Sequence, residues 1–134
     1  MSGRNVVDSS GWLEYLAGTP RARLFAAAIE DAAHLIVPVL SVYEVFKKVR
    51  RERGERDALQ VAAVMQSGQV VDIDTSLCLE AAHFDLPLAD SLMYATAQRH
   101  QALLWTQDDA FEGLEGVKYF PRRGSTPPRA RIPG

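Results

Sequence analysis

Short runs of apolar residues alternate along this chain with longer stretches in which apolar positions recur every three or four residues. The short runs are typical of buried strands, and the longer periodicity is typical of amphipathic helices. In the stretch 39–53, Val42, Val45, Phe46 and Val49 stand at helical spacing. Strands are predicted at 6–7, 34–37, 69–72, 102–105 and 117–120, and helices at 10–17, from Pro20 onward, and at 39–53, 55–67, 75–83, 88–100 and 108–113.

This alternation of short strands and helices predicts an α/β fold, in which βαβ units build a parallel sheet. Right-handed crossovers would place helices on both faces of that sheet. Residues 1–120 are expected to form one domain. Residues 121–134 hold four of the seven prolines and few large apolar side chains, which predicts a basic, Pro-rich and flexible C-terminal tail, with RNA contact as the alternative.

The composition allows one domain with a core of its own, since the chain has 134 residues of which 47% are hydrophobic. No apolar run approaches the ~18 residues that a membrane span needs, and the start of the chain does not resemble a signal peptide. The single cysteine, Cys78, excludes an internal disulfide, and its apolar neighbours predict a core position. These features predict a cytoplasmic protein without membrane association.

Charge is distributed unevenly although the net charge is only −2. The stretch 47–56 holds six Lys or Arg and two Glu, and the stretch 118–134 holds five Lys or Arg and no acid. A basic stripe can attract phosphate backbones, which makes Arg50 and Arg51, together with Arg53, candidates for steering a nucleic acid. A solvated helix face explains the stretch 47–56 equally well.

Four carboxylates stand near the ends of predicted strands or the starts of predicted helices: Asp8, Glu44, Asp90 and Asp108. Each has a purely structural explanation. Asp8 and Asp108 can be helix N-caps, and Asp90 suits the first turn of a helix. Glu44, placed in the first turn of helix 39–53, could complete a capping box with Ser41.

Taken together, the same four residues favour a shared metal-binding site over four separate structural roles. The carboxyl ends of parallel strands share one edge of a sheet, and Asp90 joins that edge only if the turn at Leu86-Pro87 returns the chain to it. Clustered carboxylates repel one another, and a hard divalent cation removes the conflict. Oxygen ligands favour Mg²⁺ or Mn²⁺, whereas the three histidines have no ligand-like spacing and no zinc-protease, serine-hydrolase or nucleotide-binding motif is present.

Four segments of the chain carry a resemblance to a known family: VVDSS at 6–10, SVYEV at 41–45, LADSLMYATA at 88–97 and LWTQD at 104–108, the last followed by Phe111. In this order they resemble the four acidic motifs of PIN-domain nucleases. The size and the order of elements are similar to VapC-type toxins of toxin–antitoxin pairs, over about residues 4–120. The resemblance implies a three-layer α/β/α sandwich around a short parallel sheet.

The resemblance also implies an activity and partners. It implies a Mg²⁺- or Mn²⁺-dependent endoribonuclease that is the toxin of a type II pair, hydrolyses phosphodiester bonds of RNA and thereby inhibits translation. Its expected partners are the RNA substrate, a cognate antitoxin protein and a second copy in a homodimer. Apolar positions at Trp12, Leu13, Leu16 and within 55–67 leave room for that dimer interface.

Carried over residue by residue, the resemblance assigns the catalytic, metal-binding quartet to the four acids named above. It implies that Ser10 or Thr106 adds a hydroxyl hydrogen bond to the metal shell or the phosphate. The family often has an acid just before the phenylalanine of the fourth motif, where this chain has Ala110 and places Asp109 one residue earlier. Either Asp108 or Asp109 is therefore the fourth acid.

Two other functions compete with the toxin. A PIN-type nuclease in RNA processing or decay would need the same site but no antitoxin. A non-catalytic RNA-binding module would use the fold without the chemistry. A response-regulator-like domain is disfavoured, because such domains have paired acids after the first strand and this chain has Asp8 alone.

Overall fold

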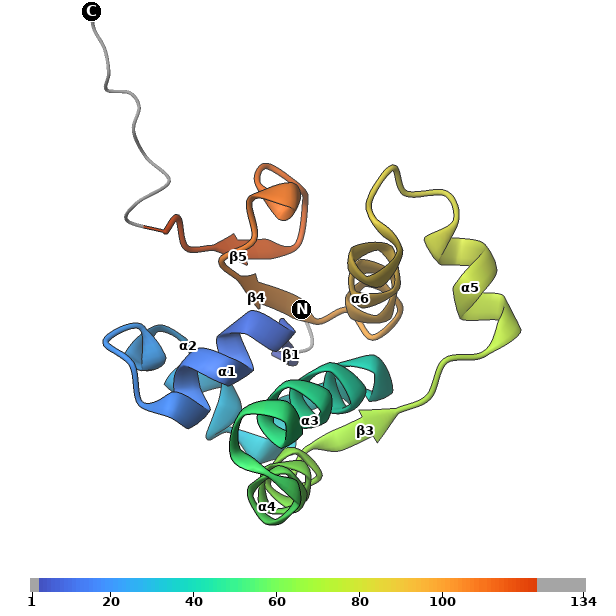
Figure 1. Ribbon diagram of the computed structural model, residues 1–134. Helices are drawn as coiled ribbons and strands as arrows, with labels where there is room; N and C mark the ends of the chain where they lie inside the picture. The colour runs from blue at the N-terminus through green and yellow to red at the C-terminus, as the bar shows by residue number, and fades with distance from the viewer. Residues whose placement is uncertain (1–2, 123–134) are drawn as a thin grey trace, which may run out of the picture.

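A five-stranded, wholly parallel sheet forms the centre of the molecule in the computed structural model, which describes residues 3–122 (Figure 1). The strands lie side by side in the order β3-β2-β1-β4-β5. Their bounds are β1 Asn5–Val7, β2 Leu35–Pro38, β3 Gln69–Val71, β4 Leu103–Thr106 and β5 Val117–Tyr119. The chain builds outward from β1 in one direction to β3 and then starts again on the other side of β1 with β4. The order of the strands therefore reverses between β1 and β4.

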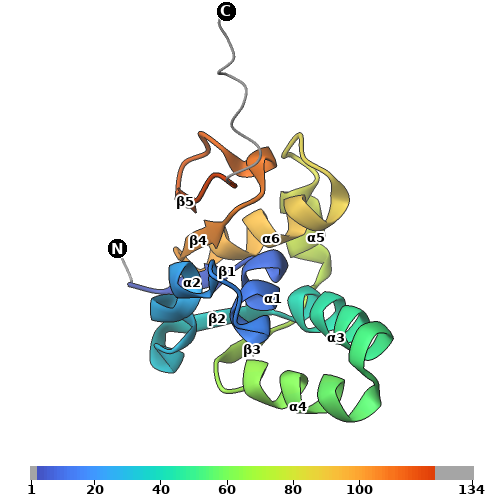
Figure 2. The same ribbon diagram turned by 60° about the vertical axis from the view of Figure 1, so that its left-hand side comes forward.

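Helices cover both faces of the sheet, as Figures 1 and 2 show. The α-helices are α1 Ser9–Ala17, α2 Ala22–Ile29, α3 Val39–Arg53, α4 Glu55–Met65, α5 Thr75–Ala81 and α6 Leu88–Arg99, and the short 3₁₀ helices are η1 Ala32–His34 and η2 Asp109–Phe111. Helices α1 to α4 pack against one face, and α6, backed by α5, packs against the other together with η2. The expected three-layer α/β/α fold is confirmed.

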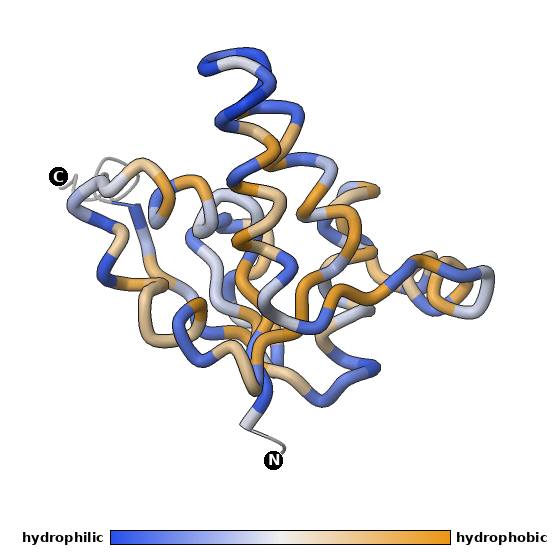
Figure 3. The backbone as a smooth tube through the Cα atoms, turned by 90° about the horizontal axis from the view of Figure 1, so that it is seen from below, coloured by the Kyte–Doolittle hydropathy of each residue, from blue (hydrophilic) through white to orange (hydrophobic). Residues whose placement is uncertain are grey.

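Alternation along the strands divides the core between the two faces. Val7 packs among α1 to α4, whereas its neighbour Val6 packs against α6 and η2. The same alternation puts Leu35 and Val37 on the first side and Ile36 on the second. Successive side chains of a strand point to opposite faces, so short apolar runs can feed two cores at once. In Figure 3 hydrophobic stretches of the chain accordingly run through the centre of the molecule.

The predicted elements all exist, and most of their bounds agree within one or two residues. The helix expected from Pro20 begins at Ala22, and the helix expected at 108–113 is only the three-residue turn of η2. The bounds of α3 are those predicted, 39–53. Since α3 begins directly after Pro38, Ser41 is buried in its first turn rather than at the N-cap, and Glu44 lies in its second turn. The capping-box explanation of Glu44 is therefore wrong.

Two further expectations about single residues are wrong. Cys78 is exposed on α5 instead of buried, because that short helix turns Leu77 and Ala81 inward. Trp12 is fully buried in the core between α1 and the sheet, so it takes no part in an interface.

Within residues 3–122 no helix is long and apolar enough to cross a membrane. The division of the chain at residue 120 stays a prediction, since residues 123–134 of the expected tail lie outside the described residues.

Candidate active site

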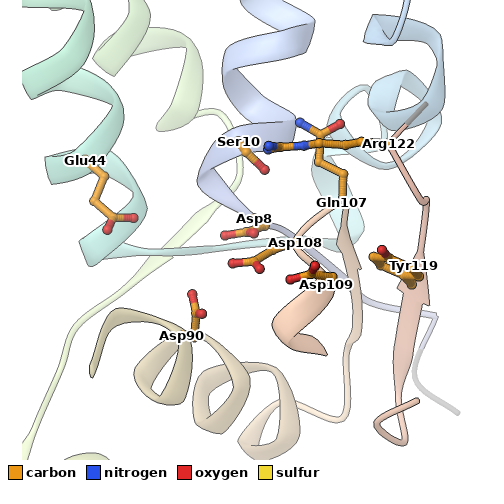
Figure 4. Close-up of a pocket in the computed structure, with 9 residues that line it drawn as sticks. All are labelled: Asp8, Ser10, Glu44, Asp90, Gln107, Asp108, Asp109, Tyr119 and Arg122. Carbon is orange, nitrogen blue, oxygen red and sulfur yellow. The ribbon is translucent and has the colours of Figure 1, made fainter. Parts of the chain in front are cut away.

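A polar pocket of about 400 Å³ opens at the carboxyl edge of the sheet, where β1 and β4 end side by side. This is the point at which the order of the strands reverses, the usual place for a ligand site in an open α/β sheet. Residues from five separate segments line it: Asp8, Ser10, Glu44, Asp90, Gln107, Asp108, Asp109, Tyr119 and Arg122 (Figure 4).

Asp8 is both a helix cap and a member of the pocket. Its backbone N–H donates to the Trp105 carbonyl at 3.0 Å, which extends the pairing of β1 with β4 by one residue. Its Oδ1 accepts from the backbone N–H of Ser9 at 2.8 Å at the start of α1. The residue is 7% exposed, and its carboxylate faces the pocket. The N-cap explanation of this aspartate is therefore confirmed, and its carboxylate lies in the pocket at the same time.

Thr106 links two of the acids from beneath the pocket. Its hydroxyl, fully buried at the end of β4, donates to Oδ2 of Asp8 at 2.8 Å and accepts from the backbone N–H of Asp108 at 3.0 Å. The residue does not line the pocket itself. Thr106 is thus placed to position the two carboxylates rather than to touch a bound substrate.

Glu44 and Asp90 reach the pocket from helices on opposite faces of the sheet. Glu44 lies on α3, and its Oε1 accepts a 2.6 Å hydrogen bond from the hydroxyl of Ser9 on α1. Asp90 is the third residue of α6, whose first turn begins after Pro87. The turn before α6 therefore does return the chain to the carboxyl edge, the condition on which the grouping of Asp90 depended.

Asp108 and Asp109 both lie on the pocket wall after β4. Asp108 caps η2, with its Oδ1 accepting from the backbone N–H of Ala110 at 3.0 Å. Asp109 is more exposed and belongs to η2 itself. Both carboxylates face the pocket. Either of them can therefore serve as the acid of the fourth motif, although Ala110 stands where the family often has one.

The crowding of carboxylates changes their acidity. Burial raises the pKa of Asp8 to about 6, and the charges of Asp108 and Glu44 add to the shift against the hydrogen bonds from Thr106 and Ser9. Burial also raises the pKa of Asp90 to about 7, helped by the neighbouring charges of Asp108 and Asp8 and by a hydrogen bond shared with Asp108. The pocket therefore holds more negative charge than its surroundings compensate.

The donor set suits a hard divalent cation. All the acidic side chains of the pocket offer oxygen, and no histidine lines it. Burial and, to a smaller extent, mutual repulsion raise the pKa values of Asp8 and Asp90, and a bound cation would favour their charged forms. Among residues 3–122 no group of three Asp, Glu, His or Cys side chains is already arranged to hold a metal ion. The carboxylates would therefore have to turn inward by side-chain rotation to share one cation.

Arg50 and Arg51 are not brought to this pocket. Both are exposed near the end of α3, about 9 Å further along the helix than Glu44 at 1.5 Å per residue. Arg50 forms an ion pair with Glu55 at the start of α4, with an Nε–Oε1 distance of 2.9 Å. The solvated-face explanation fits these two residues better than a contact with a substrate at the acids.

Three residues of the pocket escaped the sequence analysis: Gln107, Tyr119 and Arg122. Gln107 stands between Thr106 and Asp108 in the fourth motif and could have been found there. Tyr119 and Arg122 follow from the position of β5, whose carboxyl end shares the edge with β4. The signal was the strand prediction at 117–120, which places the residues after it beside the acids.

Comparison with known proteins was made on both sequence and structure. The family model described as PIN domain matches residues 6–117. No curated protein sequence matches the chain.

Solved structures resemble the fold over most of its length. A toxin–antitoxin complex from Klebsiella pneumoniae is similar with a TM-score of 0.71 and 19% identity, covering 85% of this chain and 95% of that one. VapC20 of Mycobacterium tuberculosis, named as a sarcin–ricin loop cleaving toxin, has a TM-score of 0.64 and 19% identity over 80% and 92% of the two chains. DNA-bound VapBC from Salmonella typhimurium has a TM-score of 0.66 and 12% identity over 88% and 97%.

Proposed function

This chain belongs to the PIN domain family, and we propose that it is a metal-dependent endoribonuclease that acts as the toxin of a type II toxin–antitoxin pair. The observation that carries the proposal is the convergence of Asp8, Glu44, Asp90 and Asp108 on one pocket from four separate parts of the chain. Capping explains Asp8 and Asp108 one at a time, but it does not explain why all four face the same space.

We assign the binding of Mg²⁺ or Mn²⁺ to Asp8, Asp90 and Asp108, with Glu44 as a further ligand or as the base that orients the attacking water. When bound, the cation would stabilise negative charge on the phosphate and lower the pKa of water. Asp109 lies beside Asp108 on the pocket wall and can share its role as a ligand of the cation. Thr106 and Ser9 hold Asp8 and Glu44 in place through the hydrogen bonds described above.

The protonation of the acids fits this arrangement. With a pKa of about 7, Asp90 would keep a proton for part of the time near neutral pH as long as no cation is present. Binding of a cation favours the charged form and releases that proton. The polar pocket, open to solvent on one side, leaves room for a phosphodiester to approach the carboxylates for in-line attack by water.

RNA is the substrate that we propose, with inhibition of translation as the consequence in the cytoplasm. Support comes from the structural likeness to VapC20, which is named as a toxin that cleaves the sarcin–ricin loop. At 19% identity this likeness supports the fold, and RNA as the substrate class rests on the PIN domain match together with the acidic pocket.

We propose a cognate antitoxin as the protein partner, because similar folds occur in a toxin–antitoxin complex and in VapBC complexes. A second hollow, the groove between α1, α3 and α4, would receive it. Its apolar lining comes from Leu13, Leu16, Ala17, Val49, Val61 and Val64, and its charged lining from Lys48, Glu52, Arg53 and Asp57. Two copies of one concave groove cannot fill each other across a two-fold axis, whereas an amphipathic helix can lay its apolar face into such a groove.

We propose in addition that the chain forms a homodimer. Outside the groove, Tyr43, Leu79 and Leu88 are 58%, 63% and 79% exposed, and such large apolar side chains are candidates for burial by a second copy. Sedimentation velocity of the purified protein tests this, and a monomer at micromolar concentration would reject it.

The first experiment is cleavage of total RNA by the purified protein, free of partner, with Mg²⁺, with Mn²⁺ and with EDTA. An Asp8→Asn variant, shown to be folded by circular dichroism, runs beside it. We expect discrete fragments that require metal and disappear in the variant. Absence of cleavage with either metal would reject the nuclease in favour of a non-catalytic RNA-binding module.

The partner is tested in the cell. Expression of the chain alone should arrest growth, and co-expression of a small neighbouring open reading frame should restore it. Cleavage of RNA without growth arrest and without such a neighbour would instead indicate a nuclease of RNA processing or decay.

A further inference from the structure

Above the carboxylates in Figure 4, the pocket has a second wall made of Ser10 from α1, Gln107 after β4 and Arg122 after β5. We propose that Arg122 and Ser10 form a phosphate-binding subsite, which takes a backbone phosphate of single-stranded RNA next to the one that is cleaved. The inference rests on the proposed nuclease function and adds to it the residues that hold the substrate.

Arg122 is the only cationic side chain among the residues that line the pocket in the described part of the chain. Its side chain extends across the pocket toward α1, where Ser10 lies (Figure 4). A guanidinium stays charged at every physiological pH, and its planar set of N–H donors matches the oxygens of a phosphate. Five carboxylates line the same pocket and repel a phosphate, so the side on which Arg122 lies is the favourable one for a phosphate to enter.

Ser10 supplies an independent observation. Its Oγ is buried on the wall of the pocket and has no hydrogen-bond partner among residues 3–122. Buried hydroxyls in folded proteins are nearly always paired, so a hydroxyl of this kind beside a pocket indicates a ligand that completes it. A phosphate oxygen would accept from Ser10 and from Arg122 together.

Arg21 fixes the chain segment that delivers Arg122. From the connection between α1 and α2 its guanidinium donates to the carbonyls of Phe120 at 3.1 Å and Pro121 at 3.4 Å, directly before Arg122. Its Nε also donates to Oε1 of Gln107 at 2.6 Å. Arg21 is thus a positioning residue, which ties the segment after β5 to the loop after β4.

The far end of the Gln107 amide is held as well. Its Nε2 donates to Oε2 of Glu14 at 2.8 Å, and Oε1 of Glu14 in turn accepts from the hydroxyl of Thr19 at 2.6 Å. Gln107 is 2% exposed. These hydrogen bonds fix Gln107 and the backbone directly before Arg122 within the protein itself. This part of the wall is therefore pre-organised, and a pre-organised site loses less entropy on binding.

The test is the binding of a fluorescent single-stranded RNA of about ten nucleotides, followed by anisotropy over a series of salt concentrations. An Asp90→Asn background with Mg²⁺ prevents the proposed cleavage during the measurement. We expect Arg122→Gln to weaken binding by about tenfold and to reduce the slope of log K against log salt by about 0.7, the value for one phosphate contact on a single strand. Arg122→Lys should keep most of the slope, since it keeps the charge, and Ser10→Ala should weaken binding without changing the slope.

Arg23→Gln is the matched control, because Arg23 is exposed on α2 and does not line the pocket. The subsite is rejected if Arg122→Gln binds like this control, or if the Asp90→Asn parent does not bind the RNA. Weaker thermal stability of Arg122→Gln with unchanged RNA binding would also reject it, as the sign of an arginine that only neutralises the carboxylates.

The outcome also separates this inference from the proposed function. A protein that binds RNA through Arg122 but cleaves none with Mg²⁺ or Mn²⁺ keeps the subsite and loses the nuclease. A protein that cleaves RNA with the same KM in Arg122→Gln as in the wild type keeps the nuclease and loses the subsite.

Discussion

The acidic pocket and the groove between α1, α3 and α4 differ in the chemistry of their linings, although helix α1 contributes to both. The pocket at the carboxyl edge gathers acids whose sequence positions lie far apart, and burial, with the charges of neighbouring acids, raises the pKa values of Asp8 and Asp90. The groove between α1, α3 and α4 exposes apolar side chains from helices that are packed for stability. Clustered carboxylates distinguish the pocket, and exposed apolar side chains distinguish the groove. We therefore propose different ligands for the two hollows: a cation with a phosphate for the pocket, and a protein helix for the groove.

Removing a carboxylate from the pocket should give the largest effect. We expect Asp90→Asn to reduce RNA cleavage by about 10³-fold, because the variant loses a proposed ligand of the cation that would stabilise the transition-state charge. The midpoint of thermal unfolding should stay the same or rise, since the variant relieves repulsion among Asp8, Asp108 and Glu44. Kinetics on an RNA substrate and a thermal melt without metal give the two readings, and a strongly destabilised variant would return Asp90 to a structural role.

A charge placed in the groove should act on the partner alone. We expect Val64→Glu to weaken antitoxin binding by at least about tenfold, because a carboxylate would have to be buried against apolar contacts. RNA cleavage by the free protein should not change. Titration calorimetry with the antitoxin measures the first effect and the cleavage assay the second.

Leu59 offers the control for that experiment, since it lies on the same helix, is 55% exposed and does not line the groove. Leu59→Glu should bind the antitoxin as the wild type does. Equal losses in Val64→Glu and Leu59→Glu would show that the groove has no special part in binding.

Thr106→Val tests whether the acids of the pocket depend on the buried hydroxyl of Thr106, which holds Asp8 and Asp108 in place. The change keeps the shape of the side chain but removes the hydrogen bond to Asp8 and the acceptor for the Asp108 N–H. We expect cleavage to fall by about tenfold and stability by about 1–2 kcal/mol, the cost of a buried polar group left unpaired. Thr106→Ser should restore most of both quantities, and a Ser variant as inactive as the Val variant would point to packing of the methyl group instead.

The smallest expected effect is the dependence of stability on pH without metal. The folded-state pKa values of Asp8 and Asp90, about 6 and about 7, lie above the ordinary 3.8, so the folded state binds more protons than the unfolded state between these values. As far as these groups are concerned, stability should be greatest below pH 3.8 and should fall as the pH rises from there through about 7. Thermal melts at pH 5 and pH 7.5 should differ by a few degrees, and the difference should shrink in Asp90→Asn and on addition of Mg²⁺. A melting midpoint that rises over this pH range in the wild type and equally in Asp90→Asn would contradict the assignment.

The order of strands and helices was predictable from the sequence because hydrophobic periodicity is a local property. The helix α3 was predicted from the spacing of Val42, Val45 and Val49, and the short apolar runs at β2 and β4 were typical of buried strands. Asp8 and Asp108 could be recognised as candidates because each directly follows such a strand or stands close behind it. Membership of the family, expected from four short motifs, is confirmed over residues 6–117.

The exposure and the partners of single residues were harder to predict where the residue lies in a short element or far from the site in space. Cys78 was expected inside and lies outside, since a seven-residue helix such as α5 carries too few apolar positions to define its buried face. Arg50 and Arg51 were candidates for steering a substrate, with a solvated helix face as the alternative. The length of α3 carries both residues away from the acids, and Arg50 pairs with Glu55.

The sequence by itself determined the succession of elements and the two-sided burial of the strands, and it named the candidate acids while leaving Asp108 and Asp109 open as the fourth. The tertiary structure alone decided that β1 pairs with β4, that α6 starts at the same edge, and that Arg21 ties the segment carrying Arg122 to the loop carrying Gln107. The physical reason is that periodicity and capping depend on neighbours within a few residues. Pairing between strands about 100 residues apart depends instead on how all the apolar faces are buried at once, and no local pattern records that.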